Sequence, residues 1–457
     1  MQNPFNDTIV ALATPPGVGA IGVIRVSGKE TIPLINEIFY GKDLTKCESH
    51  TISYGTIRTE KETILDEVLV SLFKAPTSYT TEDVIEISTH GSGYIIQKVI
   101  ELIISKGARL AKAGEFTQRA FINGRFDLAQ AEAVADLIAS ENAAMQQTAM
   151  KQMRGGFSNE ITKLRERLVH FASMIELELD FSEEDVEFAN RKDLEKLIAE
   201  IQETLSPLIE SFKWGNVIKK GVPVVIAGKP NAGKSTLLNA LLNEQRAIVS
   251  EIAGTTRDVI EDQLTIEGIT FRFIDTAGLR ETKDEIEALG VQKTEEKLRN
   301  ASLILYLIDL TTAQMDEVND ELAPIMQAGT PFMVIGNKTD LLTSEQLAEW
   351  QKRHPIIPMA AKPQEGIDEL KGHLVRKVKE DQVASDQTIV TNSRHFQSLV
   401  KTDESLAKVL LAVRDNVSGD FLAQDIREAL HHLGEVTGQV TTDDLLDNIF
   451  SKFCIGK

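Results

Sequence analysis

The stretch Gly228-Lys-Pro-Asn-Ala-Gly-Lys-Ser235 decides the fold of the central part of this chain. It fits the pattern G-x-x-x-x-G-K-[S/T], follows the apolar run Val222–Ala227 and opens a helical pattern over Lys234–Leu242. This context is typical of a phosphate-binding P-loop, in which backbone N–H groups surround phosphate oxygens at a helix N-terminus. We expect Lys234 to reach the terminal phosphates and the hydroxyl of Ser235 to bind Mg²⁺.

Strand and helix patterns alternate along the sequence that follows. The runs Thr270–Ile274, Leu303–Ile308 and Phe332–Ile335 are typical of buried strands, and Ile367–Val378 is typical of an amphipathic helix. Alternation of this kind predicts a doubly wound α/β domain, here placed over residues 216–384.

Two further motifs of this domain concern the nucleotide. Asp275-Thr-Ala-Gly278 offers a carboxylate for the Mg²⁺ shell and a backbone N–H for a γ-phosphate, which leaves ATP and GTP open. Asn337-Lys-Thr-Asp340 resembles the guanine-reading motif of the GTPase superfamily, because the Asp340 carboxylate can accept both N1 and N2 hydrogens of guanine. The sequence therefore predicts GTP. A third superfamily motif, Ser-Ala-Lys, survives only as Ala360-Ala361-Lys362 and lacks the serine hydroxyl.

A region resembling a GTPase switch covers Ser250–Asp258, where Thr256 is the expected second Mg²⁺ hydroxyl. Many small GTPases carry, after the Asp-Thr-Ala-Gly motif, a Gln that orients the attacking water. Here that position is Leu279, whose side chain cannot hydrogen-bond to water, so another residue must do so. The acidic candidates nearby are Glu281, Asp284, Glu285 and Glu287.

Two different patterns flank the α/β domain. Residues 8–124 mix strand runs with a helical stretch near Ile95–Ser105, which predicts an α+β domain. Residues 126–211 and 394–453 carry helical patterns without strand signals, and the first of these stretches is expected to break at Gly155-Gly156 and near Asp180–Ala189. A complete α/β unit between two helix-only stretches indicates an insertion, with both stretches packing as one bundle. The predicted organisation is an N-terminal α+β domain at 1–119, a helical domain at 120–215 and 385–457, and an inserted P-loop domain at 216–384.

Composition limits the partners and the compartment. The net charge of −20 opposes broad binding to a phosphate backbone, so any nucleic-acid contact is expected to be local, and Lys213, Lys219 and Lys220 are interpreted as a solvated linker. With no apolar run long enough to span a bilayer and no secretory signal, we expect a cytoplasmic protein without a membrane segment. The spacing of Cys47, Cys454 and the pair His431-His432 predicts neither a disulfide framework nor a zinc site.

Motifs in every part of the chain resemble the tRNA-modification GTPase family MnmE, also called TrmE. They are Thr14-Pro-Pro-Gly17, Gly114-Glu-Phe116, Asp127-Leu-Ala-Gln-Ala-Glu132, Gly254-Thr-Thr-Arg-Asp258, Asp275-Thr-Ala-Gly-Leu-Arg280 and Phe453-Cys-Ile-Gly-Lys457. The resemblance extends from Asp7 to Lys457. It implies a folate-binding N-terminal domain that dimerises, a helical domain built from two separated stretches and an inserted GTP-hydrolysing domain.

The resemblance also implies a reaction. Acting in a heterotetramer with MnmG, a partner that uses FAD and NADH, a homodimer would install a carboxymethylaminomethyl or aminomethyl group at C5 of a tRNA wobble uridine. The one-carbon unit would come from a tetrahydrofolate derivative in its 5,10-methylene form, with the 5-formyl form as a ligand. The folate contacts implied for this chain are Arg25, Glu82, Arg125 and Lys457, of which Arg125 replaces a residue that is often Lys.

For hydrolysis, the resemblance assigns the orientation of water to Glu287, with Lys234 as the second catalytic residue. The γ-phosphate needs compensating positive charge, and no switch Arg is placed as an arginine finger. The resemblance implies K⁺, bound by Asn231, Thr255 and the carbonyls of Ser250 and Ile252. The GTP contacts expected from the motifs and the resemblance are Asn231, Ala232, Gly233, Lys234, Ser235, Thr236, Ser250, Thr255, Thr256, Asp275, Thr276, Ala277, Gly278, Asn337, Lys338, Asp340, Ala361 and Lys362.

Other interpretations exist for the class of GTPase, for a glycine-rich motif and for Cys454. A ribosome-assembly or signalling GTPase would share the nucleotide motifs but have no use for folate. The sequence Gly17-Val-Gly-Ala-Ile-Gly22 spells a dinucleotide-binding motif, but it leads into a β-branched run rather than a helix, so no Rossmann cofactor is predicted. Cys454 could act as a nucleophile, and buried packing near the folate site is an equal expectation for it.

Overall fold

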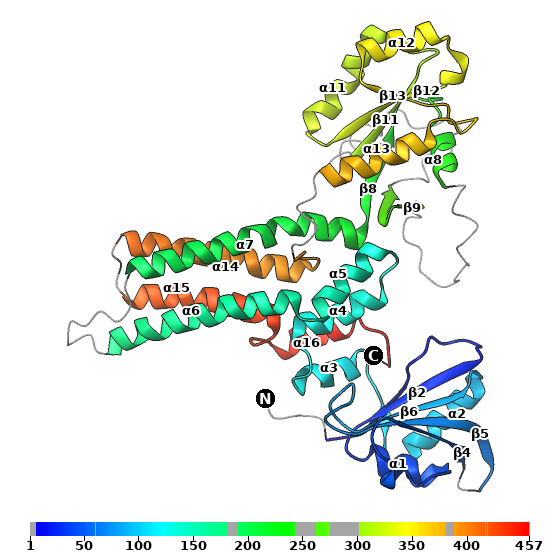
Figure 1. The fold of residues 1–457 in the computed structure, drawn as a ribbon, viewed down its shortest axis with the longest axis vertical. Helices are drawn as coiled ribbons and strands as arrows, with labels where there is room; N and C mark the ends of the chain where they lie inside the picture. The colour runs from blue at the N-terminus through cyan, green and yellow to red at the C-terminus, as the bar shows by residue number, and fades with distance from the viewer. Residues whose placement is uncertain are drawn as a thin grey trace. The chain divides into compact units, whose positions relative to one another are not determined.

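The computed structural model describes residues 6–59, 61–180, 191–242, 262–274, 301–380, 388–415, 417 and 419–456 (Figure 1). The chain divides into two compact units. The first comprises Met1–Ala139, Ala149–Ser206 and Gln397–Lys457, and the second comprises Ser140–Thr148 and Pro207–Phe396.

A seven-stranded sheet forms the N-terminal part of the first unit, in the order β3-β4-β5-β6-β2-β1-β7. Side chains alternate along its strands, so that Val68, Val70 and Leu72 of β5 are buried against the helices α1 and α2 while Leu69 is exposed. The elements are β1 (Ile9–Leu12), β2 (Ile21–Ser27), α1 (Thr31–Ile38), β3 (Phe39–Tyr40), β4 (Thr51–Arg58), β5 (Ile64–Phe73), β6 (Val84–His90), α2 (Gly93–Ser105) and β7 (Arg109–Leu110). The predicted α+β class and the helix near Ile95–Ser105 are confirmed, while α1 and β4 were missed.

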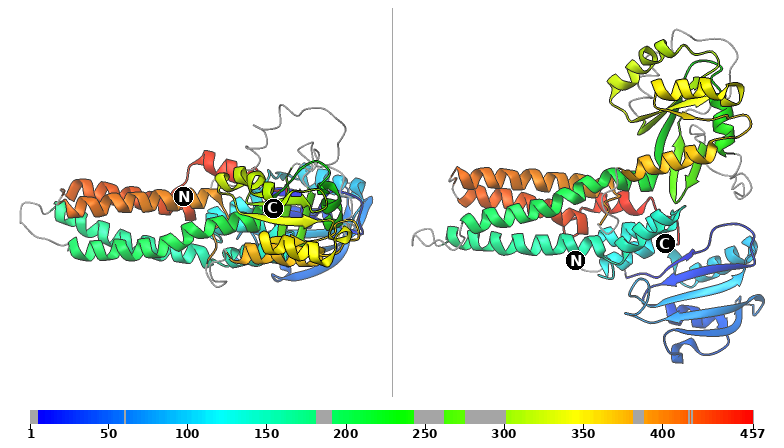
Figure 2. Two further views of the ribbon diagram at one scale, coloured as in Figure 1. Left: turned by 90° about the horizontal axis from the view of Figure 1, so that it is seen from above. Right: turned by 45° about the horizontal axis from the view of Figure 1, so that its top comes forward.

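The rest of the first unit is a helical bundle built from both flanking stretches of sequence, as predicted, and three of its helices, α5, α7 and α14, also have residues in the second unit. Helices α6 and α15 pack along each other, and Gln202 of α7 hydrogen-bonds to Asp403 of α14 at 2.9 Å (Figure 2). The bundle helices are α3 (Glu115–Ile122), α4 (Leu128–Ile138), α5 (Ala143–Met153), α6 (Gly156–Asp180), α7 (Arg191–Lys220), α14 (Ser393–Arg414), α15 (Gly419–Thr437) and α16 (Asp443–Phe450). The expected break at Gly155 is present, where the backbone φ is +85°.

The last helix ends sooner than predicted. The helical pattern reached Phe453, but α16 ends at Phe450, and the chain turns back so that Ile455 pairs with Ala113 in an isolated β-bridge. Phe450 and Phe453 both join a cluster with Phe121 and Leu128, so apolar packing rather than helix continuation places these residues.

The second unit is a doubly wound α/β fold, which confirms the predicted class. Its sheet has the order β13-β12-β11-β8-β10-β9, parallel except for the β9–β10 pair, and it separates two apolar cores. The elements are β8 (Val222–Ala227), α8 (Lys234–Leu242), β9 (Asp262–Ile266), β10 (Ile269–Phe273), β11 (Leu303–Asp309), α11 (Val318–Ala328), β12 (Phe332–Asn337), α12 (Ser344–Arg353), β13 (Ile356–Pro358) and α13 (Ile367–Glu380). β11 is buried on both faces, as expected for a central parallel strand.

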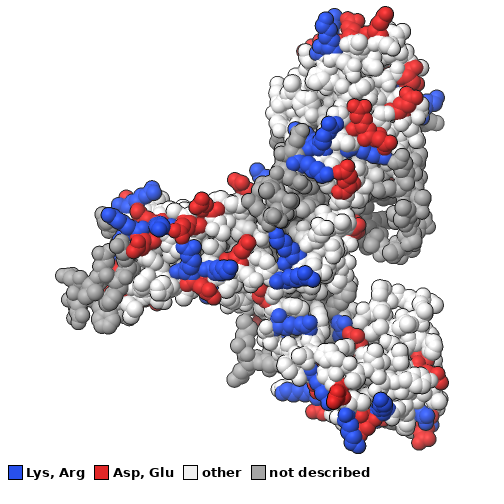
Figure 3. All heavy atoms as spheres, in the orientation of Figure 1, with Lys and Arg blue, Asp and Glu red and all other residues white. Residues whose placement is uncertain are grey.

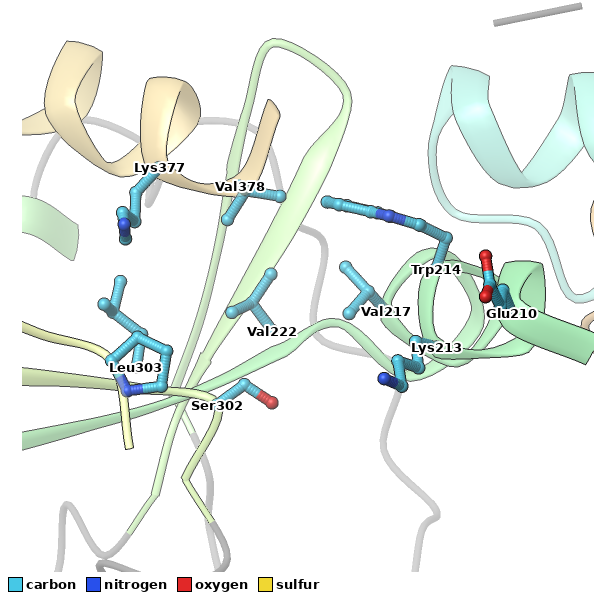
Figure 4. A pocket seen from close by; sticks show the side chains of 10 residues that line it. Glu210, Lys213, Trp214, Val217, Val222, Ser302, Leu303, Lys377 and Val378 are labelled. Carbon is cyan, nitrogen blue, oxygen red and sulfur yellow. The ribbon is translucent and has the colours of Figure 1, made fainter. Parts of the chain in front are cut away.

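Helix α7 continues to Lys220, so Lys213, Lys219 and Lys220, interpreted as a solvated linker, lie on a helix, with Lys213 and Lys220 exposed. The physical reason is that Trp214 and Val217, on its last turns, pack against the core below the sheet. Figure 4 shows both side chains beside Val222 and Val378, on the wall of a cavity of about 510 Å³.

A close backbone approach at Gly215 yields a stability prediction. A Cβ atom at this position of α7 would lie 1.8 Å from the carbonyl oxygen of Val390, whose N–H donates to Ser211 Oγ at 3.0 Å. We expect Gly215→Ala to destabilise the second unit by about 1–3 kcal/mol, because the Val390 backbone must move. Urea unfolding followed by Trp fluorescence measures the change.

Gly372→Ala is the matched control, since Gly372 lies within α13 and a Cβ there would have no neighbour within 4 Å. Alanine favours a helix interior over glycine by about 1 kcal/mol, so this variant should be more stable. Equal effects of the two substitutions would contradict the packing explanation.

Candidate functional site

The loop between β8 and α8 has a backbone that requires glycine at both ends. Gly228 has φ +144°, and a Cβ there would lie 2.3 Å from the carbonyl oxygen of Leu307. Gly233 has φ +100°, and a Cβ there would lie 2.4 Å from Nδ2 of Asn337. Asn231, at φ +65°, occupies the left-handed region that asparagine tolerates. The loop therefore has the bare, tightly wound backbone with which P-loops approach phosphate.

Lys234 opens α8 and folds back over this loop. Its Nζ donates to the carbonyl oxygens of Gly228 and Lys229 at 2.7 and 2.9 Å. Burial lowers the pKa of the Lys234 ammonium, so its charge is incompletely compensated by solvent. An anionic phosphate at the loop would supply that compensation. Ser235 and Thr236 follow on the first turn with exposed side chains.

The buried side chain of Asn337 joins three parts of this site. It ends β12, donates from Nδ2 to the carbonyl oxygen of Ala232 at 2.7 Å, and accepts from the N–H of Ala361 at 3.0 Å. Only 3% of Asn337 is exposed. The P-loop, the end of β12 and the segment after β13 are therefore fixed relative to one another.

The residues after Asn337 present charged groups at the same edge of the sheet. Lys338, with φ +65°, donates from Nζ to Asp309 at 2.6 Å, and Asp340 is exposed in the following turn. Burial raises the pKa of Asp309, but hydrogen bonds from Lys338 and Thr311 outweigh it and hold the pKa below its ordinary value. Lys362 is exposed beside the buried Ala361.

Asp309 was missed by sequence reasoning. It is the last residue of β11, whose other residues are all buried. Ligands of such sheets bind at the carboxyl ends of the parallel strands, so the position of Asp309 could have indicated a role.

The remaining residues expected at this site lie outside the described parts of the chain. They are Ser250, Ile252, Thr255, Thr256, Asp275, Thr276, Ala277, Gly278 and Glu287.

A second candidate site lies in the first unit, where Arg25 and Arg125 line a cavity of about 560 Å³. Both guanidinium groups lie over the ring of Tyr79, at 5.1 and 5.2 Å from its centroid. Arg25 also donates to Glu86 at 2.9 Å, and Arg125 donates to the carbonyl oxygen of Ser78. The cavity thus combines two cations with an aromatic face, and sequence reasoning missed Tyr79 and Glu86.

Glu82, also expected here, is held differently. Its carboxylate accepts from Ser27 Oγ at 2.9 Å and from the buried Arg119 at 3.1 Å. Arg119 also pairs with Asp7 and Glu115, and it is fully buried. Glu86, and not Glu82, is the acidic residue among those that line the cavity.

The C-terminal segment reaches this cavity. The carbonyl oxygen of Gly456 accepts from Arg25 at 3.3 Å, and a Cβ at Gly456 would lie 2.1 Å from the carbonyl oxygen of Leu12. Lys457 is outside the described residues. Cys454 is exposed, so the expectation of buried packing for it is wrong: Gly456, and not Cys454, makes the close approach.

The nucleotide site defines the class of the protein. A P-loop at the carboxyl ends of a parallel sheet, joined by Asn337 to a guanine-type motif, is the arrangement of a P-loop GTP-binding protein. Within the described residues, no helix combines the length and apolarity needed to cross a bilayer.

Comparison with known proteins gives the family. A family model described as GTP-binding protein TrmE N-terminus matches residues 8–125, and one described as MnmE helical domain matches residues 128–454. The tRNA modification GTPase MnmE of Cytophaga hutchinsonii is 57% identical over 451 residues, which cover 99% of this chain and 98% of that protein. Proteins of the same name from Christiangramia forsetii and Bacteroides thetaiotaomicron are 53% and 51% identical, over 99% of this chain and 100% and 99% of their own lengths. The chain belongs to the MnmE family of tRNA modification GTPases.

Base selectivity can be tested at Asp340. We expect Asp340→Asn to weaken GTP binding about 10- to 100-fold, the cost of losing hydrogen bonds to a charged acceptor, and to improve binding of xanthosine triphosphate. Competition against a fluorescent GTP analogue measures both affinities. Asp316→Asn, at a carboxylate that is 96% exposed in the short 3₁₀ helix Met315–Glu317, should leave both unchanged. An unaltered preference for GTP in Asp340→Asn would contradict the assignment.

Proposed function

We propose that this chain is the GTP-hydrolysing component of a tRNA-modifying enzyme. With an MnmG-type partner that uses FAD and NADH, it would install a carboxymethylaminomethyl or aminomethyl group at C5 of the tRNA wobble uridine, in the cytoplasm. The observation that carries the proposal is that one chain combines the Asn337-linked nucleotide site with the Arg25 and Arg125 cavity, whose Arg25 is bonded to Gly456. A ribosome-assembly or signalling GTPase needs only the first of these.

For hydrolysis, we assign the Mg²⁺ ligands to Ser235 and Thr256, charge stabilisation to Lys234 and orientation of the attacking water to Glu287. The exposed Ser235 hydroxyl, one residue from the Lys234 ammonium on the first turn of α8, supports the Mg²⁺ assignment. Mg²⁺ would supply charge neutralisation at the phosphates. The protein's own part is to bind and orient these phosphates through the loop N–H groups and Lys234.

We assign a K⁺ site to Asn231, Thr255 and the carbonyls of Ser250 and Ile252. Asn231 fits the ion because its exposed side chain stands on the P-loop and offers a neutral oxygen. Neutral oxygens suit a large, weakly hydrated ion, whereas Mg²⁺ prefers carboxylate, hydroxyl and water ligands.

The K⁺ assignment predicts a dependence on salt identity. GTP turnover should be several-fold faster in KCl than in NaCl at equal ionic strength, because K⁺ would supply positive charge beside the γ-phosphate. An arginine finger in the same role raises the rate of hydrolysis roughly 10³- to 10⁵-fold. Asn231→Ala should erase the difference between the salts, whereas Asn239→Ala, at an exposed position on α8, should keep it. Phosphate release at fixed Mg²⁺ and protein concentration is the measurement. Equal rates of the intact chain in both salts would exclude the ion from the active site.

The N-terminal domain, 1–119, is the proposed folate-binding and dimerising part. A reduced folate carries an aromatic ring system and glutamate carboxylates, which match the Tyr79 face and the guanidinium groups of Arg25 and Arg125. Lys457 follows directly after the Gly456 carbonyl that contacts Arg25, which supports its assignment. Glu82 would act through Arg119, whose side chain it helps to hold.

The uncovered face of the N-terminal sheet supports homodimerisation. Ile52 and Tyr54 of β4 and Leu69 of β5 are 66%, 65% and 46% exposed on the face opposite α1 and α2, and Tyr54 and Leu69 lie directly across from each other. Adjacent exposed apolar side chains on a sheet face are typical of a protein interface.

Contact with tRNA would be local. The net charge is −20, and on the face shown in Figure 3 lysine and arginine side chains are interspersed with aspartate and glutamate. Broad electrostatic attraction of a phosphate backbone is therefore weak, which supports a need for the MnmG-type partner in tRNA binding.

Folate binding separates the proposed function from the other GTPases. Calorimetric titration with 5-formyltetrahydrofolate should show binding to the intact chain, and Arg125→Ala should weaken it about 10- to 100-fold without changing GTP affinity. Arg58→Ala is the control, because Arg58 lies over Tyr40 at 4.5 Å in the same cation–π geometry but is not among the residues that line this cavity. No heat of binding to the intact chain would favour a ribosome-assembly or signalling role.

A further inference from the structure

Helix α15 carries three potential metal ligands on adjacent turns. The Nε2 atom of His431 lies 3.5 Å from Oε1 of Glu435, and Nδ1 of His432 lies 3.1 Å from Oε2 of the same carboxylate. The ligand atoms of all three residues lie within 4.8 Å of one another. In the described part of the chain, this is the only such group of three His, Cys, Asp or Glu side chains.

These separations suit a small divalent ion. With Zn–N and Zn–O distances of about 2.1 Å, tetrahedral ligand atoms lie roughly 3.4 Å apart. The two nitrogen-to-carboxylate distances, 3.5 and 3.1 Å, are near that value, and each imidazole contacts a different oxygen of the carboxylate. Two imidazoles and one carboxylate favour Zn²⁺ and its transition-metal neighbours over Mg²⁺, which prefers oxygen ligands only.

A neighbouring helix orients the carboxylate. Ser398 of α14, which is 5% exposed, donates from Oγ to Oε2 of Glu435 at 3.3 Å. Metal sites characteristically have such an outer hydrogen bond to a ligand, which fixes the ligand in place.

A simpler explanation for the contacts is an ion pair between Glu435 and protonated histidines. The chain contains such a pair for comparison, His373 and Glu369 of α13, with the same i,i+4 spacing and a distance of 3.8 Å. The α15 group differs from it in two respects: a second imidazole contacts the same carboxylate, and a buried hydroxyl from another helix orients that carboxylate.

We propose that His431, His432 and Glu435 bind one divalent transition-metal ion of the Zn²⁺ type, with Ser398 as the outer partner that positions Glu435. The site lies in the bundle, on residues to which neither the GTP nor the folate function is assigned. A three-residue ligand set leaves a fourth position for water.

The experiment is titration of the full-length chain, treated with chelator and desalted, with Co²⁺ alone and then with Zn²⁺ as competitor. We expect Co²⁺ to give the visible absorption of a low-symmetry, four-coordinate site, and Zn²⁺ to displace it. Both His432→Ala and Glu435→Gln should abolish this absorption. Ser398→Ala should weaken the site about 10-fold, the lower end of the effect of losing an outer partner.

His373→Ala is the matched control and should bind Co²⁺ as the unaltered chain does. Circular dichroism and GTP turnover confirm that each variant is folded, since none of these residues is placed at the nucleotide site. The proposal is overturned if the unaltered chain gives no such absorption, or if His432→Ala and Glu435→Gln retain it. Unchanged affinity in Ser398→Ala would overturn the role assigned to that hydroxyl.

Discussion

The buried amide of Asn337 is the constraint on which the geometry of the nucleotide site depends. Its Nδ2 and Oδ1 atoms satisfy the carbonyl oxygen of Ala232 in the P-loop and the N–H of Ala361 after β13. Loss of this side chain would leave two buried backbone groups without partners, at about 1–3 kcal/mol each. A Cβ at Gly233 would meet the same amide, so the glycine of the loop and the asparagine of the guanine motif are determined together.

In the first unit, a close backbone contact between Gly456 and Leu12 fixes the C-terminal segment against the N-terminal sheet. Gly456 approaches Leu12 so closely that a Cβ would lie 2.1 Å from its carbonyl oxygen, and Ile455 pairs with Ala113. The chain therefore returns to the first strand of the N-terminal sheet after forming the whole bundle. Arg25, which lines the cavity, donates to the Gly456 carbonyl, so the position of this side chain depends on a segment more than 400 residues away in sequence.

Much of the fold and part of the nucleotide site could be predicted because short stretches of sequence determine them. The apolar runs that became β8, β11 and β12, the P-loop between strand and helix, and the glycine break before α6 all follow from short-range patterns. Three features depend on tertiary contacts that no window of sequence contains: the extension of α7 to Lys220 through packing of Trp214, the early end of α16, and the exposure of Cys454. The carboxylate of Glu435 meets two histidines through i,i+4 and i,i+3 spacing on α15, and the spacing of His and Cys residues alone does not contain this pattern.

The ion pairs of Arg119 distinguish Glu82 from Glu86, the carboxylate that lines the cavity with Arg25 and Arg125. Arg119 is fully buried among Asp7, Glu82 and Glu115, so withdrawal of one carboxylate to bind a ligand would leave part of a buried charge uncompensated, and breaking a buried pair costs about 3–5 kcal/mol. Glu86, which is half-buried and already bonded to Arg25 at the cavity, can change partners at lower cost. Displacement of Glu86 from its partner therefore costs less than displacement of Glu82, which is bonded to Arg119 and Ser27 at the loop that carries Tyr79.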